Sequence, residues 1–244
     1  MNLVKRVSKL MFRNSENNIN DISNFGKDFA KKSYSQCGED LIVNYLFSLR
    51  GMNMPSYIDI GANHPWFINN TAFFYKKGCR GINIEPNPNL ISIFEKERPL
   101  DKNLNIGISN LNTEKMDFYV MKDNTLSTFS KAEADNFVGH GKELEKIIKI
   151  KIDTIQEVLK KYNNEIFPDL LNLDVEGLEL EILNGIDFIN NYPKVICVET
   201  AEYSPIGSGK KRNNLMNFIE SKSYYLYADT NLNSIYIRNE FWNK

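Results

Sequence analysis

The chain has 244 residues, a length that fits either one large α/β domain with elaborations or a domain plus a small appendage, and 42 % of them are hydrophobic, enough to build a core. Lysine and arginine number 30 and aspartate and glutamate number 31, so the formal net charge is −1. This balance lacks the basic excess typical of nucleic-acid-binding proteins, and we expect no nucleic-acid partner. Three cysteines far apart in the sequence disfavour a disulfide framework, and this favours a reducing compartment such as the cytoplasm. With only two histidines, a zinc site is also disfavoured.

The N-terminal segment 1–12 is basic and has neither the apolar core of a signal peptide nor the length of a membrane span. Its apolar residues share one helical face, which allows weak association with a membrane surface or a partner, whereas packing on its own domain or fraying is the favoured interpretation. We expect residues 1–32 to be a helical extension and linker, and residues 33–244 to be the main domain. The sequence is compatible with both a monomer and a homo-oligomer.

Strands and helices alternate from residue 35 onward, which is typical of a mostly parallel sheet that ends in a hairpin. The expected strands are 56–60, 80–84, 104–109, 116–120, 147–152, 169–174, 195–199, 224–228 and 234–238. The expected helices are 35–49, 67–77, 88–98, 153–161, 178–189 and 213–221, with Asp153 as a helix cap and Glu176 and Gly177 beginning a helix turn.

Residues 123–146 form one long segment without a clear core pattern. Long irregular segments in compact domains are often functional lids, and the alternative is a mobile surface insertion. We expect a substrate lid here.

Polar residues end five of the expected strands, and four of them are carboxylates. In an open α/β sheet, ligands bind beyond the carboxyl ends of the strands. A carboxylate at the end of a buried strand costs solvation unless it meets a ligand, a metal or a donor. The five residues are Asp59, Glu85, Ser109, Asp174 and Glu199.

The turn after the first strand narrows the choice of ligand. Gly61 permits a tight turn, but the sequence through Trp66 lacks the second and third glycines of a dinucleotide site. This argues against a pyrophosphate cofactor such as NAD or FAD. A nucleoside without phosphates, such as S-adenosylmethionine, tolerates Asn63 there, and Glu85 lies where a carboxylate takes both ribose hydroxyls.

Four motifs in order resemble the FkbM family of methyltransferases. They are Ser35-Gln36-Cys37-Gly38-Glu39-Asp40, Ile58-Asp59-Ile60-Gly61-Ala62-Asn63, Gly81-Ile82-Asn83-Ile84-Glu85-Pro86-Asn87-Pro88 and Leu171-Asn172-Leu173-Asp174-Val175-Glu176-Gly177-Leu178-Glu179. The resemblance covers about residues 34–202. It implies a Rossmann-like class I methyltransferase fold, with a mostly parallel seven-stranded sheet and an antiparallel C-terminal strand.

The resemblance also implies a binding mode for S-adenosylmethionine. Asp59, Gly61 and Asn63 would line its methionine part, and Glu85 would bind its ribose, with residues 69–71 nearby. The other cofactor-binding residues expected from the motifs and strand ends are Gln36, Glu39, Thr71, Pro86, Ser109 and Asp174. Asn172 stands where the family usually has lysine.

Activation of the acceptor is the chemical step that needs protein groups, because a sugar hydroxyl is a poor nucleophile until its proton is removed. Hard oxygen ligands from Asp174 and Glu199, with Glu202 nearby, suit Mg²⁺ or Mn²⁺. The alternative is a metal-free site in which Asp174 or a histidine is the base. His64 follows the cofactor turn and is a catalytic candidate, unless it caps the next helix.

We therefore expect an S-adenosylmethionine-dependent O-methyltransferase. The family acts mainly on oxygen, so the expected acceptor is a sugar hydroxyl of a glycan, a capsular polysaccharide precursor or a nucleotide-linked sugar. The alternatives are a methyltransferase of a small natural product, another nucleotide-handling enzyme and a non-catalytic binding protein on the same fold. The missing glycines and the absence of a phosphate loop disfavour the nucleotide-handling enzyme.

Overall fold

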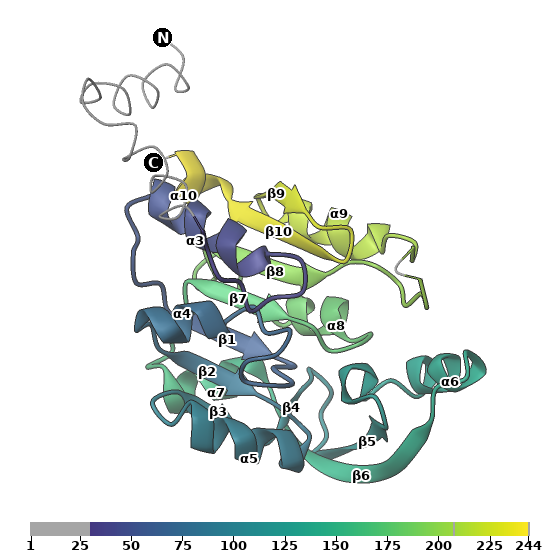
Figure 1. Ribbon diagram of the computed structural model, residues 1–244. Helices are drawn as coiled ribbons and strands as arrows, with labels where there is room; N and C mark the ends of the chain where they lie inside the picture. The colour runs from purple at the N-terminus through teal and green to yellow at the C-terminus, as the bar shows by residue number, and fades with distance from the viewer. Residues whose placement is uncertain (1–29, 207, 244) are drawn as a thin grey trace, which may run out of the picture. The chain divides into compact units, whose positions relative to one another are not determined.

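The computed structural model describes residues 30–206 and 208–243 (Figure 1). Its main sheet has seven strands in the order β3-β2-β1-β7-β8-β10-β9. Their bounds are β1 (Tyr57–Ile60), β2 (Gly81–Ile84), β3 (Lys102–Leu104), β7 (Leu170–Leu173), β8 (Val195–Glu199), β9 (Tyr224–Asp229) and β10 (Asn233–Arg238). Strand β10 is antiparallel to both of its neighbours, and the other pairs are parallel. The predicted fold class is confirmed.

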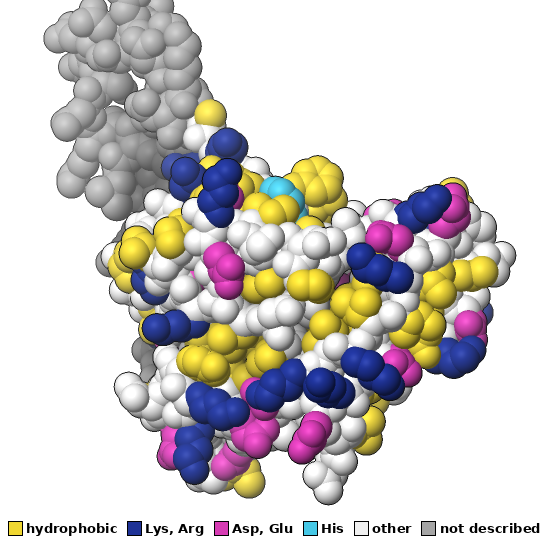
Figure 2. Space-filling view, turned by 90° about the horizontal axis from the view of Figure 1, so that it is seen from below, with side chains coloured by type: hydrophobic (Ala, Val, Ile, Leu, Met, Phe, Trp, Pro, Cys, Tyr) yellow, Lys and Arg dark blue, Asp and Glu magenta, His cyan; other side chains and the backbone are white. Residues whose placement is uncertain are grey.

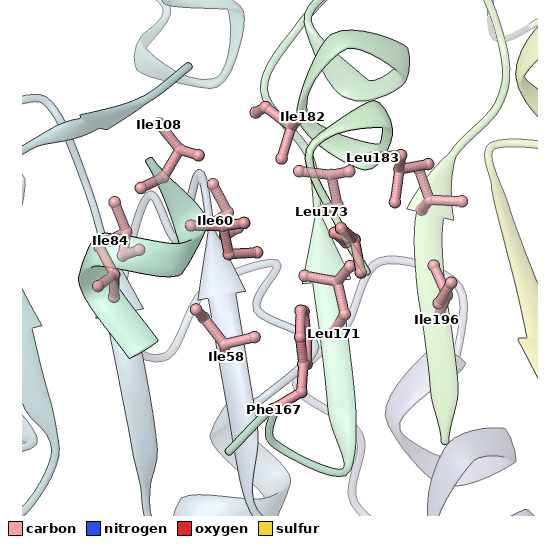
Figure 3. Packing of buried hydrophobic residues seen from close by; sticks show 14 of the residues in the cluster. Ile58, Ile60, Ile84, Ile108, Phe167, Leu171, Leu173, Ile182, Leu183 and Ile196 are labelled. Atoms are coloured by element: carbon pink, nitrogen blue, oxygen red, sulfur yellow. The ribbon is translucent and has the colours of Figure 1, made fainter. Parts of the chain in front are cut away.

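Alternation along β1 divides the protein into layers, because successive side chains of a strand point to opposite faces. Ile58 and Ile60 belong to a core shared with helices on one face, where Ile182 and Leu183 pack towards the strands (Figure 3). Tyr57 belongs to the core of the opposite face. Each fully buried isoleucine or leucine contributes roughly 1.5–3 kcal/mol to these cores.

Helices cover both faces of the main sheet (Figure 1). Those of the Ile58 face are α7 (Ile155–Tyr162), α8 (Glu179–Asn184) and α9 (Asn213–Ser221). Those of the Tyr57 face are α3 (Glu39–Leu49), α4 (Ala72–Lys77) and α10 (Asn239–Asn243). Helix α5 (Pro88–Glu97) packs its Phe94 on Ala62.

A second sheet of three strands stands beside the first, in the order β4-β6-β5. Its strands are β4 (Gly107–Ile108), β5 (Lys115–Met121) and β6 (Leu144–Asp153). The prediction of one strand over 104–109 is wrong, because this segment is divided between the two sheets. Between them, the Asn105 side chain donates to the backbone carbonyls of Glu85 and Pro86, at 2.9 and 2.8 Å, and ties this junction to the residues that follow β2.

The segment 123–146 contains regular structure that the sequence pattern did not predict. It holds the short 3₁₀ helix η2 (Asn124–Leu126), helix α6 (Lys131–Gly139) and the start of β6. Helix α6 begins directly after Ser130, whose hydroxyl oxygen accepts from the N–H of Glu133 at 3.2 Å. It buries only Ala134 and Phe137, so its sequence lacks a wide apolar stripe.

Three helix starts differ from the prediction by two residues or more. Helix α3 begins at Glu39 instead of residue 35, after Gly38 with a positive φ of 88°. Helix α4 begins at Ala72, after a turn in which Ile68 has a positive φ of 49° that a helix cannot contain. Helix α7 is capped by Thr154 instead of Asp153, in a capping box with Glu157.

Residues Ser33–Lys244 form one compact unit. The segment 1–12, considered above for a membrane-surface helix, lies outside the described residues. No helix among the described residues has both the length and the apolar character needed to cross a bilayer. On the face shown in Figure 2, lysine and arginine side chains are interspersed with acidic and hydrophobic ones, in keeping with the balanced net charge.

Candidate active site

A cavity of about 400 Å³ lies at the carboxyl ends of the central strands. Four strand-end carboxylates predicted from the sequence line it together, namely Asp59, Glu85, Asp174 and Glu199. They come from β1, β2, β7 and β8 or from the residues directly after them. Parallel strands bring these groups to one edge of the sheet, which is why residues up to 140 positions apart meet here.

Gly61 opens the turn after β1 in a conformation that favours glycine, with φ at 82°. A Cβ atom at this position would lie 1.7 Å from the backbone oxygen of Asp174. The turn after β1 and the end of β7 therefore touch through backbone atoms. Asn63 also has a positive φ, 53°, which places its N–H towards Glu85.

Glu85 is buried and caps two turns at once. Its Oε2 accepts from the N–H of Asn63 at 2.8 Å, and its Oε1 accepts from the N–H of Asn87 at 2.7 Å. Burial raises the pKa of Glu85 to about 8, and these two hydrogen bonds oppose part of that rise. Its exposure to the cavity leaves the carboxyl able to bind hydroxyl groups of a ligand.

Asp59 is held by three side chains on the buried side of the cavity. Its Oδ1 accepts from Asn172 at 2.8 Å, and its Oδ2 accepts from Thr71 at 2.7 Å and Asn69 at 3.2 Å. Burial raises the pKa of Asp59, while these hydrogen bonds and the charge of Arg98 lower it. The side-chain amide of Asn172 on β7 is thus one of the three donors that hold Asp59.

Asp174, Glu176 and Glu199 form an acidic cluster in which one carboxylate oxygen of each lies within 4.8 Å of the others. Burial, followed by repulsion from neighbouring carboxylates, raises the pKa of Asp174 to about 7 and those of Glu176 and Glu199 well above normal. The Oε2 atom of Glu199 is buried without a hydrogen-bond partner, with an Arg212 nitrogen 3.9 Å away. Such a site favours binding of a proton or a cation.

Glu176 was expected to begin a helix, but the structure gives it a different role. Helix α8 begins at Glu179, whose carboxylate accepts from the N–H groups of Val175 and Gly177 and pairs with Arg212 at 2.8 Å. Glu176 itself has a positive φ of 56°, a conformation that costs energy outside glycine. The sequence feature that could have indicated its place in the acidic cluster is its position two residues after Asp174.

The segment 123–146 attaches directly to this cluster. The hydroxyl of Thr128 donates to the backbone oxygen of Glu176 at 2.7 Å. The amide of Asn87 donates to Asn124 at 3.2 Å, which joins η2 to the start of α5. Tyr203 follows β8 and packs edge-on against Phe137 of α6, with ring centroids 5.0 Å apart.

The other predicted site residues divide into two groups. Gln36, Gly61, Asn63, Pro86 and Glu202 line the cavity. Glu202 is exposed and lies outside the acidic cluster of three.

Four predicted residues lie outside the cavity lining. Glu39 is buried and accepts from Thr230 at 2.9 Å and Asn233 at 3.0 Å, so it ties the start of α3 to the β9–β10 hairpin. Thr71 lies behind Asp59. Both residues support the cavity wall from outside it.

Ser109 and His64 complete this group of four. Ser109 directly follows β4 of the second sheet and donates to Glu181 at 2.7 Å. The Nδ1 atom of His64 accepts from the N–H groups of Trp66 and Phe67 at 3.2 and 3.1 Å. His64 therefore caps a turn at residues 66 and 67 and not the next helix, because α4 begins only at Ala72 with Thr71 as its N-cap.

The sequence matches the Methyltransferase FkbM domain family over residues 59–226, from β1 into β9. A search of curated proteins found no match. Solved structures with similarity include the methyltransferase FkbM from Methylobacillus flagellatus KT, with 15 % identity and a TM-score of 0.44 over 75 % of this chain and 43 % of that chain. A putative caffeoyl-CoA O-methyltransferase from Staphylococcus aureus has 12 % identity and a TM-score of 0.43, covering 98 % and 100 %. The match to the Methylobacillus flagellatus protein covers 43 % of that protein, so this chain spans less than half of its length. The family match covers more than half of the chain, and the chain belongs to the FkbM methyltransferase domain family.

Proposed function

We propose that the protein is an S-adenosylmethionine-dependent O-methyltransferase whose acceptor is a sugar hydroxyl of a glycan or of a sugar precursor. The observation that carries this proposal is that the acidic cluster lines the same cavity as the Gly61 turn and Glu85. One part of the cavity suits a nucleoside, and another suits removal of a proton from an oxygen. A methyltransferase needs both within a few ångströms.

The cofactor would occupy the part of the cavity beside β1 and β2. Asp59, Gly61 and Asn63 would contact its methionine part, whose sulfonium and ammonium charges complement Asp59. Glu85 would accept hydrogen bonds from the ribose hydroxyls, with Pro86 beside it. Hydroxyl donors and a nearby cation favour the charged form of a buried carboxyl, so ligand binding would lower the pKa of Glu85.

Asp174 is the residue best suited to act as the base. A base with a pKa near the working pH takes a proton most effectively, and the pKa of Asp174 is raised to about 7. In the proposed step the acceptor oxygen bonds to the methyl carbon as the carbon–sulfur bond breaks. The electron pair of the broken carbon–sulfur bond stays on sulfur, and the proton of the acceptor hydroxyl passes to Asp174.

A metal-assisted version of the same reaction is the second candidate, and the spacing of the acidic cluster favours it. Asp174, Glu176 and Glu199 offer three hard oxygen ligands within 4.8 Å of one another, a donor set that suits Mg²⁺ or Mn²⁺. The unpartnered Oε2 of Glu199 fits a ligand role. A divalent cation there would lower the pKa of a bound hydroxyl.

The far wall of the cavity supports a polyhydroxylated acceptor. It is lined by the hydrogen-bonding side chains of Asn124, Thr125, Ser127 and Ser204 and by the ring of Tyr203. Amides and hydroxyls can pair with sugar hydroxyls, and an aromatic ring can cover the apolar face of a sugar. Three of these five residues come from the segment 123–146, which we propose is the acceptor-binding lid.

Calorimetry tests the cofactor. S-adenosylmethionine and S-adenosylhomocysteine should bind with a one-to-one stoichiometry, and NAD should not bind. Absence of binding by both sulfur nucleosides would overturn the proposed function.

Turnover measurements separate the two versions of the mechanism. Asp174→Asn should reduce transfer to a sugar acceptor by about a hundredfold or more while S-adenosylhomocysteine still binds. Loss of activity in EDTA, restored by Mg²⁺ or Mn²⁺, would establish the metal-assisted version. Full activity in EDTA would establish the metal-free version.

A further inference from the structure

A fully buried arginine lies behind the proposed cofactor site. Arg98 follows α5, and neither its side chain nor that of its ion-pair partner Asp101 is exposed to solvent. Its Nε donates to the Oδ2 of Asp101 at 3.0 Å. A buried charge persists only when it is paired and hydrogen-bonded, so this arrangement needs a structural or functional reason.

The guanidinium is held in one orientation from every side. Its Nη2 donates to the hydroxyl of Tyr57 at 2.9 Å and to the amide oxygen of Asn83 at 3.0 Å. The ring centroids of Phe94 and Tyr75 lie 5.2 and 5.1 Å from its central carbon. Planar donors fixed against rings in this way allow little movement of the group.

Two short side chains connect Arg98 to Asp59. Thr71 accepts from Nη2 of Arg98 at 3.0 Å and donates to the Oδ2 of Asp59 at 2.7 Å. Asn69 accepts from Nη1 at 3.1 Å and donates to the same oxygen at 3.2 Å. Both paths end on one carboxylate oxygen, so the position of the guanidinium determines how that oxygen is held.

We propose that Arg98 is a positioning residue that orients the Asp59 carboxylate towards the amino-acid part of the cofactor. This inference rests on the proposed function. Asp101, Arg98 and Asp59 carry alternating charges along one buried path, with a net charge of −1 that a cationic ligand group would balance. Glu85 and Asp174 are acidic neighbours of Asp59, and Arg98 is the protein cation whose charge favours the ionised form of Asp59.

A pair of ligands tests the inference, since 5′-methylthioadenosine has the nucleoside of S-adenosylhomocysteine but lacks its amino-acid part. Arg98→Lys keeps the charge and loses the planar fork of donors. We expect this variant to weaken S-adenosylhomocysteine about tenfold and methylthioadenosine less than about twofold. A general loss of folding would weaken both ligands alike.

Thr71→Val and Tyr57→Phe form a matched pair of milder variants. Each removes one hydroxyl that accepts from Nη2 of Arg98, but only the Thr71 hydroxyl continues to Asp59. We expect Thr71→Val to reproduce the selective loss of S-adenosylhomocysteine affinity. Tyr57→Phe should lower the unfolding temperature and preserve the ratio of the two affinities.

A double variant connects the effect to Arg98. Because both substitutions break the same path, Arg98→Lys should cost less S-adenosylhomocysteine affinity in the Thr71→Val background than alone. Equal weakening of both ligands by Thr71→Val, or no selective effect in either variant, would overturn the inference. Failure of the unmodified protein to bind either ligand would instead overturn the proposed function.

Discussion

The backbone N–H of Asn63 donates a 2.8 Å hydrogen bond to the carboxylate of Glu85, which joins the turn after β1 to the end of β2. The other oxygen of this carboxylate accepts from Asn87 at 2.7 Å, at the start of α5. One buried acid therefore fixes two turns that border the cavity. Ligand affinity and local structure both depend on it.

Glu85→Gln should weaken the binding of S-adenosylhomocysteine by about ten- to a hundredfold. An amide has one acceptor oxygen, so its NH₂ group would face one of the two backbone N–H donors and leave it unsatisfied. Calorimetry gives the dissociation constant. Glu97→Gln is the matched control, since the Glu97 carboxylate at the end of α5 also accepts a hydrogen bond, from the Trp66 ring N–H, but at the exposed surface. An unchanged constant for Glu85→Gln would refute this role.

The free energy of unfolding should fall as the pH rises from about 5 to about 8, in buffer with a chelator. The pKa of Glu85 is about 8 and that of Asp174 about 7 in the folded state, against 4.5 and 3.8 as ordinary values. The folded protein therefore binds these protons more tightly than the unfolded chain. Their stabilising effect is complete below the ordinary values and is lost as the pH passes the folded values. Urea unfolding at three pH values measures it.

Asp174→Asn provides the control for this pH dependence. The variant lacks one titrating group, so it should be more stable than the unmodified protein at pH 8 by about 1–2 kcal/mol and similar to it at pH 5. Groups with a lowered pKa, such as Glu39, titrate below pH 4.5 and leave this window unaffected. A stability that rises between pH 5 and 8 would contradict the burial of these acids.

Gly61→Ala should destabilise the fold by about 3 kcal/mol, because the added Cβ meets a backbone oxygen 1.7 Å away and the residue keeps a φ of 82°. Chemical denaturation measures the change. Gly139→Ala in α6 is the matched control, since a Cβ there has no atom within 4 Å. It should be neutral or slightly stabilising. Equal effects of the two substitutions would show that the close contact is absent in solution.

Thr128→Val should raise KM for the acceptor several-fold and leave S-adenosylhomocysteine affinity unchanged. It removes the hydrogen bond to the Glu176 backbone that holds the segment 123–146 at the acidic cluster. Steady-state kinetics with a sugar acceptor and calorimetry separate the two effects. Thr113→Val, which removes an exposed hydrogen bond to the Lys115 backbone, should change neither. If Thr128→Val reduced only the affinity for S-adenosylhomocysteine, Thr128 would support cofactor binding and the prediction for the acceptor would be wrong.

Much of the fold was predictable because its strands and helices alternate in short amphipathic or apolar segments. Parallel connection of these strands brings Asp59, Glu85, Asp174 and Glu199 to one edge, and the structure shows them lining one cavity. Ser109 follows the same sequence pattern but comes directly after a strand of the second sheet. The pattern of a strand does not say which sheet it joins.

The support behind the site was not predictable. Arg98 follows a helix in the sequence, where a charged residue ordinarily faces solvent. Its burial arises from contacts with residues of β1, β2 and the turn before α4, and no local pattern encodes them. Helix α6 was not predicted because it is mostly exposed. Only Ala134 and Phe137 are buried along it, so its sequence lacks a clear apolar pattern.

The position of β10 between β8 and β9 has a practical consequence for work on this family. The family match ends at residue 226, within β9, so a fragment cut to the matched region 59–226 would lack the strand that joins β9 to the sheet. It would also lose Glu39 and Asn233, which hold the two ends of the domain together. The smallest piece that folds should therefore be longer at both ends than the region by which the family is recognised.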